Sequence, residues 1–202
     1  LNVPESNLTV IHEQYHNLIG KWYRYKGWQP FLFQDELAAA YAAGLHGILN
    51  APTGSGKTYA MFIPALCEAM SKQKTSNVAA GTLQLLWITP LRALARDIAN
   101  ALQHACDVMD SNWKVEMRTG DTDTRTRLSQ KKKMPEVLVI TPESIHVLFT
   151  SPGYDRLFSA LRAVVVDEWH ELLGSKRGVQ VELALSRFRT IVPDVRTWGI
   201  SA

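Results

Sequence analysis

Four short apolar runs limit what this chain can fold into more than any other feature. In each run most residues are apolar, rather than every second one: LQLLWIT (83–89), VLVIT (137–141), AVVVDE (163–168) and VRTWGIS (195–201). Continuous runs of this kind are typical of parallel strands covered by helices on both faces. Two weaker strand candidates are GILNA (47–51) and KVEMRT (114–119).

Segments with helical periodicity separate these strands. Apolar residues recur with the spacing of one helix face from Leu91 to Met109 and again from Val181 to Val192, and residues 58–70 and 143–150 are shorter candidates. Alternating strands and helices imply right-handed βαβ crossovers. The sequence therefore predicts an α/β fold of three layers with a mainly parallel sheet. In such folds ligands bind at the carboxyl ends of the strands.

The composition narrows the class of protein. The chain has 202 residues, 46% hydrophobic and 20% charged, which suits one soluble globular domain, and no apolar run approaches the ~20 residues that span a bilayer. Cys67 and Cys106 lie on different predicted helices without metal-ligand spacing, so we expect two buried thiols. A net charge of +3 is too small to indicate a polyanion partner by itself. The run Lys131–Lys133 is interpreted mainly as solvated surface.

Both chain ends look unusual. The start, LNVPESNLTV, lacks an initiating Met and the features of a secretory signal, and the last residues, Ser201 and Ala202, fall inside a strand candidate. We therefore expect a piece of a longer protein. Residues 1–33 are polar and helical, with aromatic residues near their end, and are predicted to form an extension packed on the α/β body.

The stretch APTGSGKT (51–58) follows a strand candidate and opens a helix, which is the setting of a phosphate-binding P-loop. Its glycines let backbone N–H groups turn towards phosphates, and the helix N-terminus adds positive potential. The lysine would neutralise the β- and γ-phosphates, and the last threonine would offer its hydroxyl to Mg²⁺. The predicted nucleotide-binding residues are Thr53, Gly54, Ser55, Gly56, Lys57 and Thr58. Ala51 departs from the usual glycine, and the alternative is a glycine-rich turn with a chance lysine.

The strand VVVDEWH ends in two adjacent carboxylates, which are costly to bury without a cation. Asp167 is placed to hold Mg²⁺, and Glu168 is placed to orient and deprotonate an attacking water. The alternative is a pair of solvated acids at a strand end. His170 fits a structural and a functional role equally well.

Together the motifs APTGSGKT, TPLRALA, RTGDT, TPES and DEWH, in this order, resemble motifs I, Ia, the Thr-Gly motif, Ib and II of superfamily 2 helicases, from about residue 28 to the chain end. The longer stretches VLVITPESIHVLF and DEWHELLGSKRGVQVELALSR resemble Lhr-like (large helicase-related) enzymes, most of all the ligase-associated DNA DExH-box branch. The resemblance implies a RecA-like ATP-binding domain over residues 34–202, preceded by a 1–33 extension with the Q-motif region. Ser201 and Ala202 match the first two letters of motif III, so the resemblance implies a cut within that motif.

The resemblance also assigns roles to residues outside the P-loop. Gln34 matches the glutamine that reads adenine, and Trp28, Phe31 and Phe33 are candidates to stack on the base, although packing under the first helix explains at least two of them equally well. Tyr23 and Tyr25 are weaker stacking candidates. His170 and Ser201 are implied to couple the nucleotide site to the strand-binding groove.

The remaining motifs are implied to line a groove for one nucleic-acid strand, where backbone N–H groups, hydroxyls and guanidinium groups bind phosphates. The residues concerned are Thr89, Pro90, Arg92, Thr119, Gly120, Thr141, Pro142, Glu143 and Ser144. Each threonine could instead cap the helix that follows it. The basic loop GSKRG (174–178) has no partner that the sequence identifies.

By resemblance, the parent protein is an ATP-dependent DNA helicase or translocase that uses ATP and Mg²⁺. It would move 3′ to 5′ on single-stranded DNA, or on RNA in the alternative, and would act in DNA repair beside an ATP-dependent ligase and a nuclease. The expected location is the cytoplasm, at the nucleoid, without a membrane. A second RecA-like lobe would supply arginines worth about 10³–10⁵ in rate, so we expect this chain alone to be nearly inactive.

Two other classes of protein fit less well. Another P-loop NTPase would not explain TPLRALA, TPES and DEWH, and a GTPase would need an Asn-Lys-x-Asp signature that is absent. A non-catalytic nucleic-acid-binding module would leave Lys57, Asp167 and Glu168 without a role.

Overall fold

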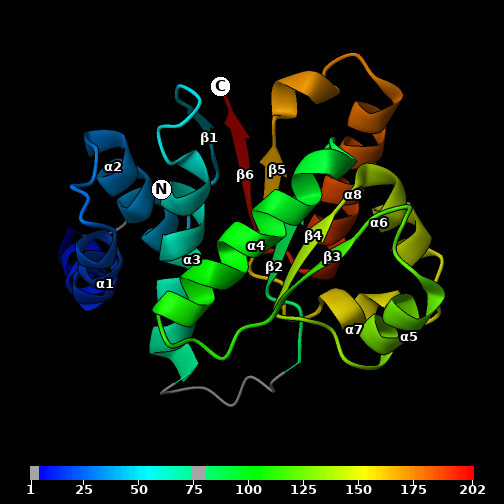
Figure 1. Ribbon diagram of the computed structural model, residues 1–202, viewed down its shortest axis with the longest axis horizontal. Helices are drawn as coiled ribbons and strands as arrows, with labels where there is room; N and C mark the ends of the chain where they lie inside the picture. The colour runs from blue at the N-terminus through cyan, green and yellow to red at the C-terminus, as the bar shows by residue number, and fades with distance from the viewer. Residues whose placement is uncertain (1–4, 74–80) are drawn as a thin grey trace.

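The sheet of this protein is entirely parallel in the computed structural model, which describes residues 5–73 and 81–202. Its six strands have the order β1-β6-β5-β2-β4-β3 (Figure 1). The strands are β1 (Gly47–Asn50), β2 (Leu85–Ile88), β3 (Val115–Arg118), β4 (Val137–Ile140), β5 (Ala163–Asp167) and β6 (Arg196–Ser201). The two weaker strand candidates are the two edges, where one face or side of a strand can remain open.

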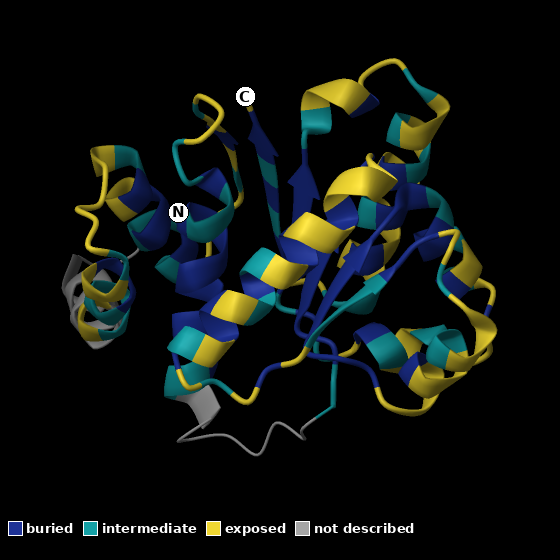
Figure 2. Ribbon diagram, in the orientation of Figure 1, coloured by how far each residue is buried: buried dark blue, intermediate teal, exposed yellow. Residues whose placement is uncertain are grey.

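Helices cover both faces of the sheet, which confirms the predicted three-layer α/β fold. One face packs against α1 (Glu5–Lys26), α2 (Leu32–Ala42), α3 (Lys57–Gln73) and α4 (Arg92–Val108). The other packs against α6 (Pro142–Phe149), α7 (Tyr154–Phe158) and α8 (Lys176–Ile191). Along β2, Leu85 and Trp87 contribute to the first core and Leu86 and Ile88 to the second, so the central strands are buried throughout (Figure 2).

Four elements were not expected from the sequence: α2, α5 (Thr124–Lys132), α7 and the 3₁₀ helix η1 (Trp169–Leu172). α5 carries the basic run, and Lys131–Lys133 are exposed, in agreement with their interpretation as solvated surface. Cys67 and Cys106 are buried free thiols, as predicted, and burial raises the pKa of each to about 12.

The N-terminal helix α1 lies against α2 and α3, and its Trp22 is fully buried. Gln34 falls in the first turn of α2, because that helix begins at Leu32. In the described part of the chain, no helix is long and apolar enough to cross a membrane.

A buried ion pair fixes the start of β6 to these helices. Arg196 contacts the carboxylate of Glu68 on α3, and its second nitrogen donates a 2.9 Å hydrogen bond to the carbonyl of Tyr41 on α2. Both charged side chains are nearly inaccessible to water, so each charge is stabilised by the opposite charge instead of by water.

A candidate nucleotide site beside a candidate nucleic-acid groove

The P-loop candidate connects β1 to α3 at the carboxyl edge of the sheet. Gly54 and Gly56 have φ values of +81° and +82°, which are unfavourable for any other residue. Lys57 is the first residue of α3, and its Nζ donates a 2.6 Å hydrogen bond to the carbonyl of Ala51. The amine is therefore folded back into the loop, next to the N-terminus of a long helix.

Two hydroxyls in this loop are available to a ligand. The Oγ of Ser55 is buried without a hydrogen-bond partner among the described residues, and Thr58 is half-buried in the first turn of α3. A buried hydroxyl without a partner is costly, and a phosphate oxygen would satisfy it. The loop thus fits a nucleotide phosphate. Thr58 and Asp167 could supply oxygen ligands to Mg²⁺, which usually takes only one or two ligands from the protein and the rest from phosphates and waters.

Gln34 is tied to the phosphate loop by its side-chain amide. Its Oε1 accepts hydrogen bonds from the Tyr23 hydroxyl and the Phe31 backbone N–H, both at 3.0 Å, and its Nε2 donates to the carbonyl of Ser55 at 3.1 Å. A Cβ at Gly56 would lie 2.9 Å from the same Nε2, so the loop glycine also leaves room for the amide. Tyr23, a weak stacking candidate, thus orients Gln34. Burial, with a smaller contribution from Asp35, raises the pKa of the Tyr23 hydroxyl to about 12.

The aromatic candidates near Gln34 lie in two groups. Phe31 and Phe33 stack on one another with ring centroids 5.9 Å apart, whereas Trp28 lies 6.3 Å from Tyr59 on α3. Trp28 and Phe31 are both about half exposed.

Asp167 ends β5 as a buried carboxylate with two donors. Trp87 Nε1 donates to its Oδ2 at 3.3 Å, and the backbone N–H of Glu168 donates to its Oδ1 at 3.0 Å. Burial raises the pKa of Asp167 to about 6, although the Trp87 hydrogen bond and the charge of Lys57 act in the opposite direction. Trp87 was not predicted as a site residue. In the sequence it is one more apolar residue of a buried strand, and nothing there indicates that its N–H is used as a donor.

Glu168, His170 and Ser201 form a chain of polar contacts at the same edge. Glu168 has a positive φ of 44°, unusual for this residue type, and directly precedes η1. His170 Nδ1 lies 3.4 Å from Glu168 Oε2 and within hydrogen-bonding distance of Ser201 Oγ. The carbonyl of Ser201 accepts a 3.2 Å hydrogen bond from the N–H of Ala51. The two predicted coupling residues therefore lie together, between Glu168 and the phosphate loop.

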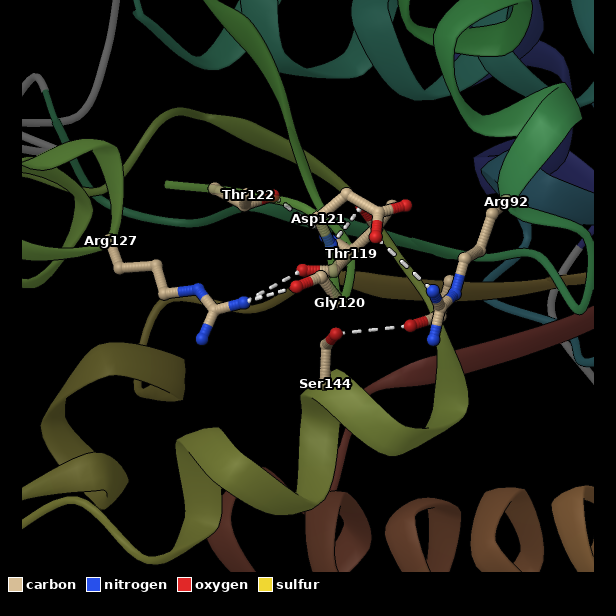
Figure 3. A network of polar contacts seen from close by, with 8 residues as sticks. Arg92, Thr119, Gly120, Asp121, Thr122, Arg127 and Ser144 are labelled. Carbon is tan, nitrogen blue, oxygen red and sulfur yellow. Dashed lines mark hydrogen bonds and ion pairs between the residues drawn. The ribbon is translucent and has the colours of Figure 1, made fainter. Parts of the chain in front are cut away.

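The candidate groove is formed where β2, β4 and β3 end side by side. Thr89 and Pro90 follow β2, Thr119 and Gly120 follow β3, and the segment from Thr141 follows β4. Arg92 extends from α4 towards the turn after β3 (Figure 3), where its guanidinium lies 3.3 Å from Asp121 Oδ1. A Cβ at Gly120 would lie 2.8 Å from Arg92 Nη2, so a larger residue here would displace the guanidinium from this position.

Arg127 on α5 stabilises the same turn from its other side. Its Nη2 donates to the carbonyls of Thr119 and Gly120, at 3.2 and 2.8 Å (Figure 3). The N–H of Thr119 donates to Thr122 Oγ1 at 2.9 Å. Asp121 and Thr122 close the RTGDT motif and Arg127 follows it, but spacing alone did not separate these residues from the solvated ones around them.

The helix-capping alternative is wrong for Thr89. The N-cap of α4 is Leu91, and Thr89 Oγ1 is buried without a partner among the described residues. Thr141 does occupy the N-cap position of α6, but its hydroxyl contacts Ser144 Oγ at 3.0 Å instead of a backbone N–H (Figure 3). Pro142 begins α6, where a missing N–H costs nothing.

The basic loop 174–178 has a partner that the sequence did not identify. Ser175 caps α8, and Arg177 in the first turn of that helix donates from Nε to Glu143 Oε1 at 2.7 Å and from Nη1 to the carbonyl of Pro90 at 3.3 Å. Glu143, predicted as a groove residue, is therefore paired with an arginine. Burial raises its pKa, but hydrogen bonds from its own backbone N–H and from Arg177 outweigh this effect and lower it.

Comparison with known proteins places this geometry in a family. The sequence profile of the DEAD/DEAH box helicases matches residues 32–202. The ATP-dependent helicase Lhr-Core of Methanothermobacter thermautotrophicus is 30% identical over 95% of this chain and 23% of its own length. The structure of Mycobacterium smegmatis helicase Lhr bound to single-stranded DNA and AMP-PNP is 30% identical, with a TM-score of 0.74 over 86% of this chain and 23% of that one.

A further solved structure, the helicase MrfA, has a TM-score of 0.76 at 22% identity, covering 93% of this chain and 29% of that one, and supports the fold alone. This chain thus spans about a quarter of the length of its Lhr relatives. The family profile covers the phosphate loop, the acidic end of β5 and the three turns of the groove. The chain therefore belongs to the DEAD/DEAH box helicase family, and within it resembles the Lhr-type helicases.

Proposed function

We propose that this chain is the first RecA-like lobe of an ATP-dependent DNA helicase or translocase. The observation that carries the proposal is the continuous set of contacts from Lys57 through Ala51 and Ser201 to His170 and Glu168. The Lys57 amine and the Glu168 carboxylate thus lie at one edge of the sheet, next to a row of turns suited to a nucleic-acid backbone, which supports the proposal.

Each residue would have a defined role in ATP hydrolysis. Lys57 and the loop N–H groups would bind the β- and γ-phosphates, and Gln34 would orient the loop towards the adenine. Thr58 and Asp167 would hold Mg²⁺, which neutralises charge on the phosphates. Glu168 would orient the attacking water and accept its proton. A second lobe of the same protein would close over the nucleotide, and its opening after hydrolysis would move the strand.

DNA is the proposed substrate because the Lhr relative of known structure is bound to single-stranded DNA. The groove would hold that strand by its phosphates, with Thr89, Arg92, Thr119 and Thr141 at the ends of three neighbouring strands. By resemblance we propose 3′-to-5′ movement and a role in DNA repair at the nucleoid, with an ATP-dependent ligase and a nuclease as partners.

The decisive experiment measures ATP turnover by the full-length protein with single-stranded DNA and with RNA of equal length. We expect stimulation by DNA well above that by RNA, followed by unwinding of duplexes with 3′ tails only. Preferential stimulation by RNA would replace DNA with RNA as the substrate. If Lys57→Ala left nucleotide binding unchanged in a filter-binding assay, the phosphate-loop assignment would be wrong.

A further inference from the structure

We infer that Arg177 is a positioning residue that connects the segment following Glu168 to two turns of the groove, and so transmits strand binding to ATP hydrolysis. The inference rests on the proposed function and adds to it a residue outside the recognised motifs. Arg177 touches no predicted nucleotide ligand. Its contacts join Glu143 after β4 and Pro90 after β2.

The guanidinium makes both contacts at once because its donors form a rigid planar fork. Nε faces the Glu143 carboxylate at 2.7 Å, and Nη1 faces the Pro90 carbonyl at 3.3 Å. One side chain therefore fixes the distance between two groove turns that come from different strands. Pro90 lies between Thr89 and Arg92, and Glu143 lies in the same turn as Thr141 and Ser144.

The start of α8 is itself held closely against η1, the helix that follows Glu168. A Cβ at Gly178 would lie 2.1 Å from the carbonyl oxygen of Leu172, a distance that no side chain tolerates. Ser175 adds a 2.8 Å hydrogen bond from its Oγ to the same carbonyl and accepts the N–H of Gly178 at 3.0 Å. A displacement of η1 is thus passed to the first turn of α8 with little slack.

A second contact holds α8 against α6, so the two helices are expected to move together. His146 Nε2 lies 3.0 Å from the carbonyl of Gln180, one turn along both helices from the Arg177–Glu143 pair. The path from Glu168 therefore runs through η1 and the Gly178 contact to Arg177, and from there to both groove turns. It shares η1 with the path through His170 and Ser201, and diverges from that path at Leu172.

This bridge is poorly suited to a purely stabilising role. The side chains of Arg177 and Glu143 are 47% and 40% exposed, and ion pairs with that exposure contribute little to folding stability. An Arg177 variant should therefore remain folded, which allows its effect on coupling to be measured separately.

The test compares Arg177→Ala and Arg177→Lys with Arg189→Ala, an exposed arginine near the end of the same helix. ATP turnover of the full-length protein is measured with and without single-stranded DNA, and thermal unfolding is recorded for each variant. For Arg177→Ala we expect the ratio of stimulated to unstimulated turnover to fall about threefold to fivefold, near the upper limit for an ion pair with this exposure. Arg177→Lys, which keeps the charge but not the fork, should fall between this variant and the unaltered protein.

Each outcome is informative. A reduced ratio with an unchanged unfolding temperature, graded from arginine through lysine to alanine, supports the bridge. An unchanged ratio, or an equal loss of both rates together with a lower unfolding temperature, overturns it. If the unaltered protein shows no stimulation by any nucleic acid, the proposed function itself fails, and the bridge fails with it.

Discussion

Trp87 and Arg177 act at the carboxyl edge of the sheet on groups that are distant in the chain. Trp87 donates to Asp167, 80 positions away, and Arg177 donates to the carbonyl of Pro90, 87 positions away. A donor that acts across the fold leaves no periodic signal, so only the assembled structure identifies it. Lys57, Asp167 and Glu168, in contrast, were predicted because each belongs to a contiguous motif with its own local geometry.

The buried carboxylate of Asp167 should make the free protein less stable as the pH rises. Its pKa is about 6 in the fold, against 3.8 in the unfolded chain, so the folded state binds the proton more tightly. Stability from this group is present below pH 4 and is lost as the pH rises to 6, by roughly 2–3 kcal/mol. Asp167→Asn should lack this loss when unfolding is followed in urea at pH 4.5 and 7.5 without Mg²⁺.

The exposed Asp155→Asn is the matched control for that comparison and should reproduce the pH dependence of the unaltered chain. An Asp167→Asn variant with the same pH dependence as the unaltered chain would contradict the prediction. Asp167→Asn should also abolish ATP turnover, because the residue that destabilises the fold at neutral pH is one that the proposed reaction requires.

Arg92 should contribute to strand binding without regard to base sequence. Its guanidinium is 51% exposed and pairs with Asp121, itself 77% exposed, so a phosphate can replace that partner. Arg92→Ala should weaken single-strand binding about equally for all sequences and reduce the salt slope by about 1. Fluorescence anisotropy across a salt series measures both quantities, with Arg156→Ala as the control. Loss confined to particular sequences would refute a phosphate contact.

At the scale of elements, the sequence predicted all six strands to within two residues at each end, because buried parallel strands are continuously apolar. The two weaker runs became the edge strands, as their mixed composition indicates. α5 was missed because TRTRLSQKK has a single large apolar residue, and α7 and η1 are too short for a helical period to appear. Such elements form because the surrounding packing and caps hold them.

Removing one member of the ion pair between β6 and α3 should destabilise the fold strongly, whereas replacing both members with apolar residues should cost little. Arg196→Met would remove the positive charge beside the buried carboxylate of Glu68, at a cost of about 3–5 kcal/mol. The double variant Arg196→Met with Glu68→Leu should recover much of this loss. Urea unfolding of both single variants and the double variant gives the coupling energy, with Arg189→Met as the control. A single variant that loses less than about 1 kcal/mol would contradict the prediction.

For the whole molecule, the predicted site residues gather at one edge of the sheet, and Gln34 reaches that edge from α2 through the carbonyl of Ser55. The nucleotide loop lies at the β1 end of the strand order, and the groove lies at the β2-β4-β3 end. Asp167, at the end of β5, lies between them. This arrangement follows from a sheet that is parallel throughout, since all of its carboxyl ends point the same way.

We expect the 202-residue chain alone to bind nucleotide weakly and to hydrolyse it at background rate. In the proposed motor, arginines from a second lobe reach the γ-phosphate, and such a contact is worth about 10³–10⁵ in rate. Phosphate release at saturating ATP, with and without single-stranded DNA, tests this. Steady turnover that responds to DNA would show that this chain needs no second lobe.

The pairing of β1 with β6 has a consequence for biosynthesis. The strand that leads into the phosphate loop pairs, among the described strands, only with β6, about 150 residues further along, at Gly47↔Trp198 through Asn50↔Ser201. A ribosome therefore makes the phosphate loop early but must release the β6 segment before that strand gains its neighbour. Until then its exposed edge and apolar side chains invite pairing with other nascent chains, and this interval is where chaperone binding would matter most.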